Sequence, residues 1–222
     1  MEIFDRSMPD FEDKVITRLT GRFDPPAKLR DIVTIRFMQD IVFTYRYPLI
    51  ISEEGMASVP VTQSILQEKG ITVRQLHDLA IENTKKQYQF YATEMENILL
   101  EYGVAFGEMP WMRKDFPMIV LTNQYHLNGA SCLMDSIFLD EVADTYFKGK
   151  DYLILPSSIH EVIAIESNNT FAADKLLDLV KKANSTVVCP EDRLSDCVYR
   201  FDVNRKRLQC IAAPEIQKVP AL

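Results

Sequence analysis

Two short apolar runs in the second half of the chain, YLIL at 152–155 and EVIAIE at 161–166, are separated only by the segment PSSIH. Runs of this length, bounded by proline and serine, are typical of strands that a turn connects. We interpret them as a pair of antiparallel strands. The connecting segment also carries serine and histidine, so it raises the question of whether it has a chemical role or only reverses the chain.

The rest of this half alternates between strand and helix patterns. MIVLTN at 118–123 predicts a strand, and ASCLM at 130–134 predicts a partner strand after the turn LNG. Apolar residues at helical spacing predict one helix around 138–146 and another that begins at Thr170. Interleaved hairpins and helices favour an α+β fold with a mainly antiparallel sheet over a doubly wound parallel sheet.

The first half shows the same two kinds of pattern. Apolar residues from 9 to 19 recur at helical spacing, which predicts a short amphipathic helix, and alternation from 41 to 49 predicts a strand. MASVPVT at 56–62 predicts a second strand. Thr72 and Gln75 fit a capping box at the start of a helix, whose periodicity resumes after the polar stretch NTKKQ.

The segment EYGVAFGEMPWMRKDFP, residues 101–117, collects glycines, prolines and the only tryptophan of the chain. This composition predicts a boundary between two lobes. The N-terminal lobe, 1–107, would hold a short helix, strands and a helical segment, and the C-terminal lobe, 118–213, would be α+β. At 222 residues and 47% hydrophobic content, we expect the two to form one compact unit.

Charge and patterning bear on partners and compartment. A formal net charge of −7 makes nucleic acid a poor partner, because affinity for its backbone comes from clustered Lys and Arg. No apolar run approaches the roughly 20 residues of a membrane-spanning helix, and the start MEIFDRSMPDFEDK lacks the pattern of a signal peptide. We therefore expect no membrane association and a cytoplasmic location.

Four widely spaced cysteines are expected as reduced thiols in such a compartment. If the hairpin CVYRFDVNRKRLQC closes about Val203 and Asn204, Cys197 lies opposite Cys210. Two interpretations stay open for that pair. They are small residues on a core face, or they form a redox-labile disulfide.

No strong catalytic signature occurs in the sequence. It has no G-x-x-x-x-G-K-[ST], G-x-G-x-x-G, H-E-x-x-H, G-x-S-x-G or C-x-x-C motif, and its three histidines fall on separate predicted elements. We therefore expect neither a cofactor nor a metal.

One polar constellation remains, between the loops 123–129 and 156–161, which both follow predicted strands. Candidate catalytic residues are His126, His160, Ser157, Ser158 and Glu161, and candidate ligand-binding residues are Asn123 and Asn128. A serine nucleophile with His160 as its base is disfavoured locally, because such groups usually meet across the fold. The alternative is two turns whose polar side chains satisfy nearby backbone groups.

Four segments of the C-terminal half, in order, resemble a bacterial family, the domain of unknown function DUF5688. They are MIVLTNQYHLNGASCLM, DYLILPSSIHEVIAIES, LVKKANSTVV and LSDCVYRFD. Upstream, DIVFTYRYPL and ITVRQLHDLAIENTK extend the resemblance to about residues 30–205. It implies a cytoplasmic protein of anaerobic gut bacteria, and it implies no activity, ligand or catalytic residue.

Our leading hypothesis is a non-enzymatic interaction or regulatory protein with an unknown protein partner, linked to mobile elements or to defence. Two alternatives place a site between the loops 123–129 and 156–161. One is a hydrolase-like enzyme and the other is a sensor of a small ligand. Formation of a homo-oligomer is left open.

Overall fold

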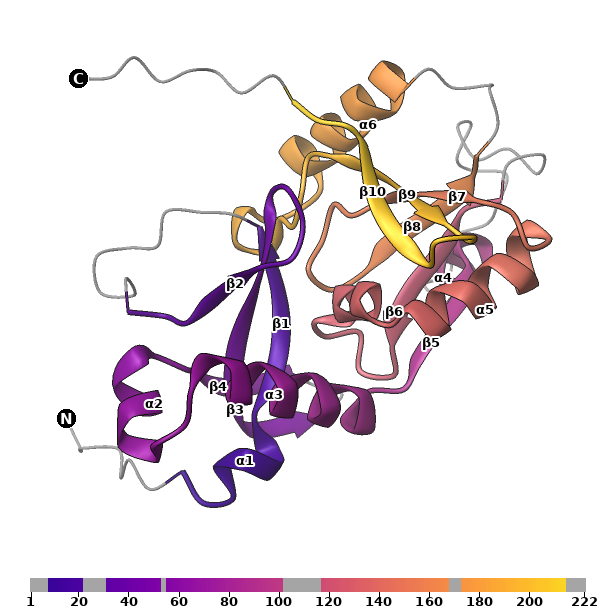
Figure 1. Cartoon of the computed structure of the whole chain (residues 1–222). Coiled ribbons are helices and arrows are strands. Elements are labelled where there is room, and N and C mark those ends of the chain that lie inside the picture. The colour runs from indigo at the N-terminus through magenta and orange to yellow at the C-terminus, as the bar shows by residue number, and fades with distance from the viewer. Residues whose placement is uncertain (1–7, 22–30, 53–54, 102–116, 168–172, 215–222) are drawn as a thin grey trace, which may run out of the picture.

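The computed structural model describes residues 8–21, 31–52, 55–101, 117–167 and 173–214. Two antiparallel sheets, each with helices against it, make up these residues (Figure 1). The smaller sheet comes from the first 60 residues, and the larger sheet comes from residue 90 onward. The predicted α+β class with mainly antiparallel pairing is confirmed.

The smaller sheet is built around one long strand. Its strands are β1 (Ile16–Gly21), β2 (Thr34–Arg36), β3 (Ile41–Ser52) and β4 (Gly55–Pro60). β1 pairs with the first half of β3, and β2 and β4 follow one another along its opposite edge. The predicted strand is confirmed, and Phe43, Tyr45 and Tyr47, at alternating positions, are all buried.

Three helices accompany this sheet: α1 (Phe11–Lys14), α2 (Gln63–Lys69) and α3 (Val73–Gln87). The capping box of α3 is confirmed, with Thr72 and Gln75 bonding each other's backbone N–H groups. The predicted helix from 9 to 19 is wrong beyond Lys14. Residues 16–21 form β1 instead, because pairing with β3 satisfies their backbone while Thr17 and Leu19 still reach the core.

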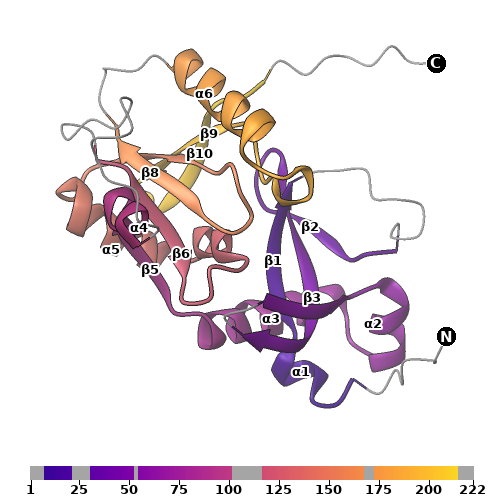
Figure 2. The same cartoon turned by 180° about the vertical axis from the view of Figure 1, so that it is seen from behind.

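The larger sheet has the strand order β10-β9-β7-β8-β6-β5, and every pair in it is antiparallel. Its strands are β5 (Phe90–Glu94), β6 (Ile119–Asn123), β7 (Tyr152–Leu155), β8 (Val162–Glu166), β9 (Val198–Asp202) and β10 (Arg207–Ala212). The predicted antiparallel pair is confirmed, with Leu153 opposite Ile165. Seen from behind in Figure 2, β6 and β8 lie side by side in the middle of the sheet.

Helices flank this sheet (Figure 2). They are α4 (Met95–Glu101), α5 (Ser136–Phe147), α6 (Ala173–Thr186) and the short 3-10 turns η3 (Gly129–Met134) and η4 (Pro190–Asp192). α5 and α6 match predicted helices, although Thr170, the predicted cap of α6, lies outside the described residues. No helix in the described residues is long and apolar enough to span a membrane.

Two predictions for residues in and around the larger sheet are wrong. ASCLM forms η3 rather than a strand, because Asn128 turns the chain with a φ of 54° and Gly129 then lies against the backbone of Thr122. The helical periodicity after Gln87 is also broken. Phe90–Glu94 are extended as β5, because β6 offers them a complete antiparallel partner.

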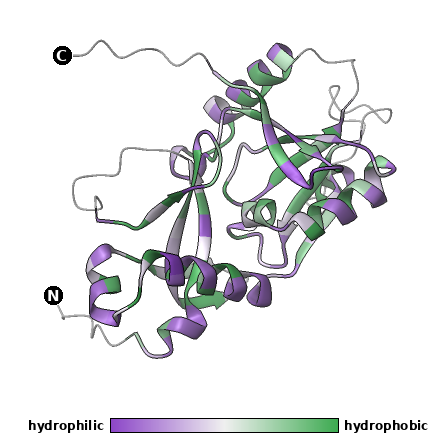
Figure 3. Cartoon of the chain, viewed as in Figure 1, coloured by the Kyte–Doolittle hydropathy of each residue, from purple (hydrophilic) through white to green (hydrophobic). Residues whose placement is uncertain are grey.

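A single cluster of buried apolar residues includes side chains from both sheets, among them Leu19, Tyr45, Leu121 and Tyr199. In Figure 3, hydrophobic residues follow the strands of the larger sheet, while hydrophilic residues occupy much of the helix surfaces. The chain passes from one sheet to the other just before β5, upstream of the segment predicted as a boundary. Most of that segment lies outside the described residues, and the division into two lobes stays a prediction.

Candidate functional site

The loops 123–129 and 156–161 meet in the structure. The backbone N–H of Asn128 donates to Nδ1 of His160 at 3.3 Å, and the hydroxyl of Thr122 donates to the carbonyl O of His160 at 2.9 Å. Gly129 makes this approach possible, because a Cβ at that position would collide with the same carbonyl O. The structure therefore brings Asn128 and His160 together.

Both ring nitrogens of His160 are engaged. Because Nδ1 accepts from Asn128, the ring hydrogen sits on Nε2, which lies 3.3 Å from Oδ1 of Asp192. A general base needs a free nitrogen within reach of the proton it removes. In this arrangement His160 acts as a structural bridge between its loop and η4.

The other candidates from these loops form local or backbone hydrogen bonds. Oγ of Ser158 accepts the N–H of His160 at 3.0 Å, and the carbonyl O of Ser157 accepts the N–H of Leu194 at 3.0 Å. Asn123 bonds Leu127 and Tyr125 within its own turn. The exposed side chain of Glu161 forms no hydrogen bond or ion pair within the described residues. The hydroxyl of Ser158 thus accepts a hydrogen bond from the residue that was its candidate base.

His126 points elsewhere. Its Nε2 lies 2.9 Å from the hydroxyl of Tyr91 on β5, and its backbone adopts a φ of 52°. Within the described ranges it makes no contact with His160. The catalytic and ligand-binding roles of the loop residues stay predictions, and only Asn128, Ser158 and His160 form one connected group.

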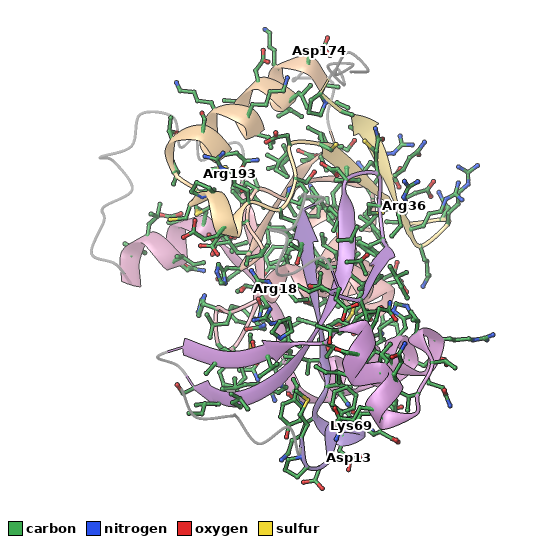
Figure 4. All side chains as sticks on the ribbon, turned by 90° about the vertical axis from the view of Figure 1, so that its left-hand side faces the viewer. Asp13, Arg18, Arg36, Lys69, Asp174 and Arg193 are labelled. Carbon is green, nitrogen blue, oxygen red and sulfur yellow. The ribbon has the colours of Figure 1, made fainter. Side chains whose placement is uncertain are left out.

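A more promising site lies beside this group. A cavity of about 540 Å³ separates the open face of the smaller sheet from the segment 184–196, which runs from the end of α6 to just before β9. We call it the inter-sheet pocket. Its polar lining includes Arg18, Arg46, Asp40, Asn184, Arg193 and Asp196. In Figure 4, Arg18 lies near the middle of the molecule, and Arg193 lies above it on the C-terminal half.

The alternation of side chains along β1 and β3 places Arg18 and Arg46 beside the pocket. Arg18 on β1 is opposite Thr44 on β3, and Ile16 is opposite Arg46, so both arginines share the sheet face away from α3. Thr17 occupies the other face, where its hydroxyl lies 3.1 Å from the hydroxyl of Thr84 on α3.

Within the described residues, the guanidinium of Arg18 forms no ion pair. Its Nε is buried and has no hydrogen-bond partner among the described residues. Burial lowers the pKa of its guanidinium, while the negative charge of Asp192 acts in the opposite direction. Asp192 is close enough to influence Arg18, yet it forms no ion pair with Arg18 within the described part of the chain.

Arg46 adds a second cation to the same wall. Its Nε donates to Oγ of Ser58 at 3.0 Å, and its Nη2 donates to the carbonyl O of Ser58 at 3.3 Å. Its pKa is also lowered, first by burial and then by the positive charge of Arg18. Two guanidinium groups that disfavour each other's charge, with neutral partners, form a site that favours a bound anion.

The carboxylate of Asp40 is hydrogen-bonded to side chains of the C-terminal half. It accepts hydrogen bonds from Ser195 at 2.7 Å, from Tyr199 at 2.5 Å and from the thiol of Cys197 at 3.3 Å. Burial, followed by Asp40, raises the pKa of Cys197 to about 12 and also raises that of Tyr199. These three donors join the two sheets at one end of the pocket.

The predicted register of the last hairpin is wrong by two residues. Cys210 lies opposite Tyr199, and Leu208 lies opposite Phe201, because the turn takes four residues rather than two. The carboxylate of Asp202 holds this longer turn by accepting the N–H of Arg205 at 2.9 Å. Cys197 and Cys210 are free thiols in the structure, and burial raises the pKa of both.

Gly21, at the end of β1, sets the width of the pocket near Leu194. A Cβ at this glycine would lie 2.6 Å from the carbonyl O of Leu194, so only glycine permits this approach. Sequence reasoning missed the pocket because it placed residues 16–19 on a helix. The signal was present for Asn184, which continues the apolar stripe Leu176, Leu177 and Val180 as a single polar residue.

No group of three or more His, Cys, Asp or Glu residues within the described ranges is arranged to hold a metal ion.

Comparison with known protein families gives a match over most of the chain. A family model described as a family of unknown function, DUF5688, matches residues 4–203, which confirms the resemblance seen in the sequence segments and extends it upstream. No curated protein and no solved structure matches the chain.

Proposed function

Because the chain belongs to the family of unknown function DUF5688, membership brings no activity with it, and we propose a function from the inter-sheet pocket. The protein is a cytoplasmic, non-enzymatic binding protein that recognises a small anionic ligand there. The observation that carries this proposal is the guanidinium of Arg18, which is partly buried, lies close enough to Arg46 to lower the pKa of that residue, and has no partner at Nε in the described residues.

The location of the pocket supports a regulatory role. Arg18 and Arg46 come from the smaller sheet, while Asn184 and Arg193 come from the segment that joins α6 to β9. A ligand that contacts both walls binds best when the two sheets are held together. It therefore stabilises one arrangement of the molecule over others.

The engaged state of His160 supports a non-enzymatic role. Neither ring nitrogen is free to act as a base, and the nearby Ser158 hydroxyl accepts a backbone hydrogen bond. The hydrolase-like alternative would require these hydrogen bonds to be exchanged on substrate binding. A link to mobile elements or to defence stays a prediction.

The test is thermal unfolding of the purified protein at pH 7.5 in low salt, with and without inorganic phosphate or sulfate. Binding to the folded state raises the melting temperature as the anion concentration passes its dissociation constant. Arg18→Gln should lose the response. The control is Arg36→Gln, which removes an exposed arginine on β2, another strand of the smaller sheet.

The two variants decide the proposal. It requires that Arg36→Gln respond like the wild-type protein and that Arg18→Gln respond far less. An equal response in both variants would mean that the anion binds elsewhere. No response in the wild-type protein would rule out an anion-binding site in the inter-sheet pocket, which we call the oxyanion site.

Binding of a protein partner is a second candidate, supported by a separate surface. Leu49 and Ile50, in the second half of β3, are 49% and 63% exposed. Leu49 also lines a groove between β4 and α2. Replacing both residues by serine should abolish a stoichiometric complex or a homodimer seen by light scattering; a complex that survives the double substitution would argue against this surface.

A further inference from the structure

The segment 184–196 forms the second wall of the inter-sheet pocket, opposite the smaller sheet. This wall carries a buried polar atom that has no hydrogen-bond partner in the described residues. Asn184, at the end of α6, lines the pocket, and only 3% of its surface is exposed. Its Nδ2 donates to the carbonyl O of Ser195 at 2.9 Å and to Oδ1 of Asp196 at 2.5 Å. Its Oδ1 has no partner in the part of the chain that the structure describes.

The orientation of this amide is determined by its neighbours. Ser195 and Asp196 both present acceptor oxygens, so exchanging Oδ1 and Nδ2 would set oxygen against oxygen. Oδ1 is therefore the atom left without a donor. A buried acceptor without a donor destabilises a folded protein, and native structures satisfy such an atom by an ordered water or by a group that binds there.

The pocket has room for more than an ion. Its volume of about 540 Å³ lies in the range typical of sites for organic ligands. The exposed carboxylates of Glu191 and Asp196 line the wall that also holds Asn184. These acceptors disfavour a second anionic group and favour hydroxyl groups, which donate hydrogen bonds without adding charge.

The first wall of the pocket, which the smaller sheet forms, favours a phosphate group over a carboxylate group. Two arginines on neighbouring strands share this face of the sheet, and a phosphate has enough terminal oxygens to meet both guanidinium groups, whereas a carboxylate fills one guanidinium fork. Nε of Arg18 and Oδ1 of Asn184 are screened from bulk water. The ligand reaches them through side-chain adjustments of the kind that are common on binding.

We propose that the ligand is a hydroxylated phosphate monoester of the sugar phosphate class. Its phosphate lies between Arg18 and Arg46, and one of its hydroxyls donates to Oδ1 of Asn184. The inference rests on the proposed oxyanion site and adds the second point of recognition, which determines the class of ligand.

The experiment is calorimetric titration of the wild-type protein with inorganic phosphate, ethyl phosphate, succinate and ribose 5-phosphate in one low-salt buffer. Ethyl phosphate carries the phosphate ester without the hydroxyls. One neutral hydrogen bond to a buried acceptor predicts that ribose 5-phosphate binds about tenfold more tightly than ethyl phosphate. Succinate should bind more weakly than either phosphate ester.

Asn184→Leu should reduce the preference for ribose 5-phosphate over ethyl phosphate to within about threefold. The matched control is Asn83→Leu, another buried asparagine, whose Nδ2 donates to the carbonyl oxygens of Glu12 and Val15 away from the pocket. The control should leave the preference unchanged. If Asn184→Leu does not fold, the wild-type series still decides the question.

The outcomes separate the two proposals. If both esters bind equally well, the hydroxyl contact is overturned and the oxyanion site stands. If succinate binds most tightly, the phosphate assignment is overturned. If none of the anions binds, the proposed function itself fails.

Discussion

The hydroxyl of Tyr199 on β9 donates a hydrogen bond to Oδ1 of Asp40, 159 positions earlier in the chain, at 2.5 Å. Tyr199 is 1% exposed, and Asp40 is the last residue before β3. Together with Ser195 and Cys197, this contact fixes the C-terminal segment against the smaller sheet.

Tyr199→Phe should therefore destabilise the protein by about 1.5–3 kcal/mol, the range for a hydrogen bond to a charged group. The matched control is Tyr152→Phe, whose buried hydroxyl donates to the neutral carbonyl O of Leu139 at 3.0 Å and should cost about 0.5–1.5 kcal/mol. Urea unfolding measures both. A smaller loss for Tyr199→Phe than for Tyr152→Phe would mean that Asp40 does not hold the two sheets together.

Arg18→Met should leave the ligand-free protein as stable as the wild type, or more stable. The guanidinium of Arg18 is partly buried without a bonded carboxylate in the described residues, and replacing such a charge by an apolar side chain of similar length removes a desolvation cost. Denaturant unfolding in a buffer without phosphate or sulfate tests this. A loss of several kcal/mol would show that Arg18 has a structural role, and would weaken the case for a binding site.

Gly21→Ala should destabilise the protein by about 1–3 kcal/mol, because the new methyl group overlaps the carbonyl O of Leu194. The strand or the segment 193–194 must then move, which widens the inter-sheet pocket. We expect weaker anion binding in addition to a lower melting temperature. Unchanged binding in a destabilised variant would show that Leu194 is not needed for the geometry of the site.

His77 should make stability fall as the pH is lowered from 7 toward 5.5. Its Nδ1 lies 2.8 Å from the hydroxyl of Tyr45, and burial lowers its pKa below the ordinary value of 6.5. The unfolded state therefore binds a proton at a higher pH than the folded state. The resulting loss of stability begins near the ordinary histidine pKa and ends below the lowered one.

His77→Gln should flatten this part of the pH profile, as measured by urea unfolding at pH 7.0 and 5.5. The control is His126→Gln, because His126 is exposed on its loop. Equal slopes for the wild-type protein and His77→Gln would assign the pH dependence to other groups.

Local patterns in the sequence were sufficient to predict much of the fold. The alternation in β3, the capping box of α3 and the strand–turn–strand pattern around PSSIH each depend on neighbouring residues, and all three are confirmed. The errors occur where a distant partner decides the conformation. Residues 16–19 have helical periodicity but are extended, because β3 supplies their hydrogen bonds.

The candidate site shows the same limit. The sequence placed His160 and Asn128 in loops that do meet, but it could not show that both nitrogens of His160 would be occupied. Arg18, Arg46 and Asn184 come from two strands and one helix, and only tertiary packing brings them around one cavity. Of the three, Asn184 alone carried a local signal, as a polar residue within an apolar stripe.

The position of β6 in the larger sheet has a consequence for protein synthesis. Its five residues are all buried, and β8, its neighbour on the side away from β5, begins only at Val162. At about 5–20 residues per second, the ribosome needs a few seconds to supply that partner. The nascent chain therefore carries an apolar strand with one unpaired edge throughout this interval, and a chaperone that covers such edges would protect it from aggregation.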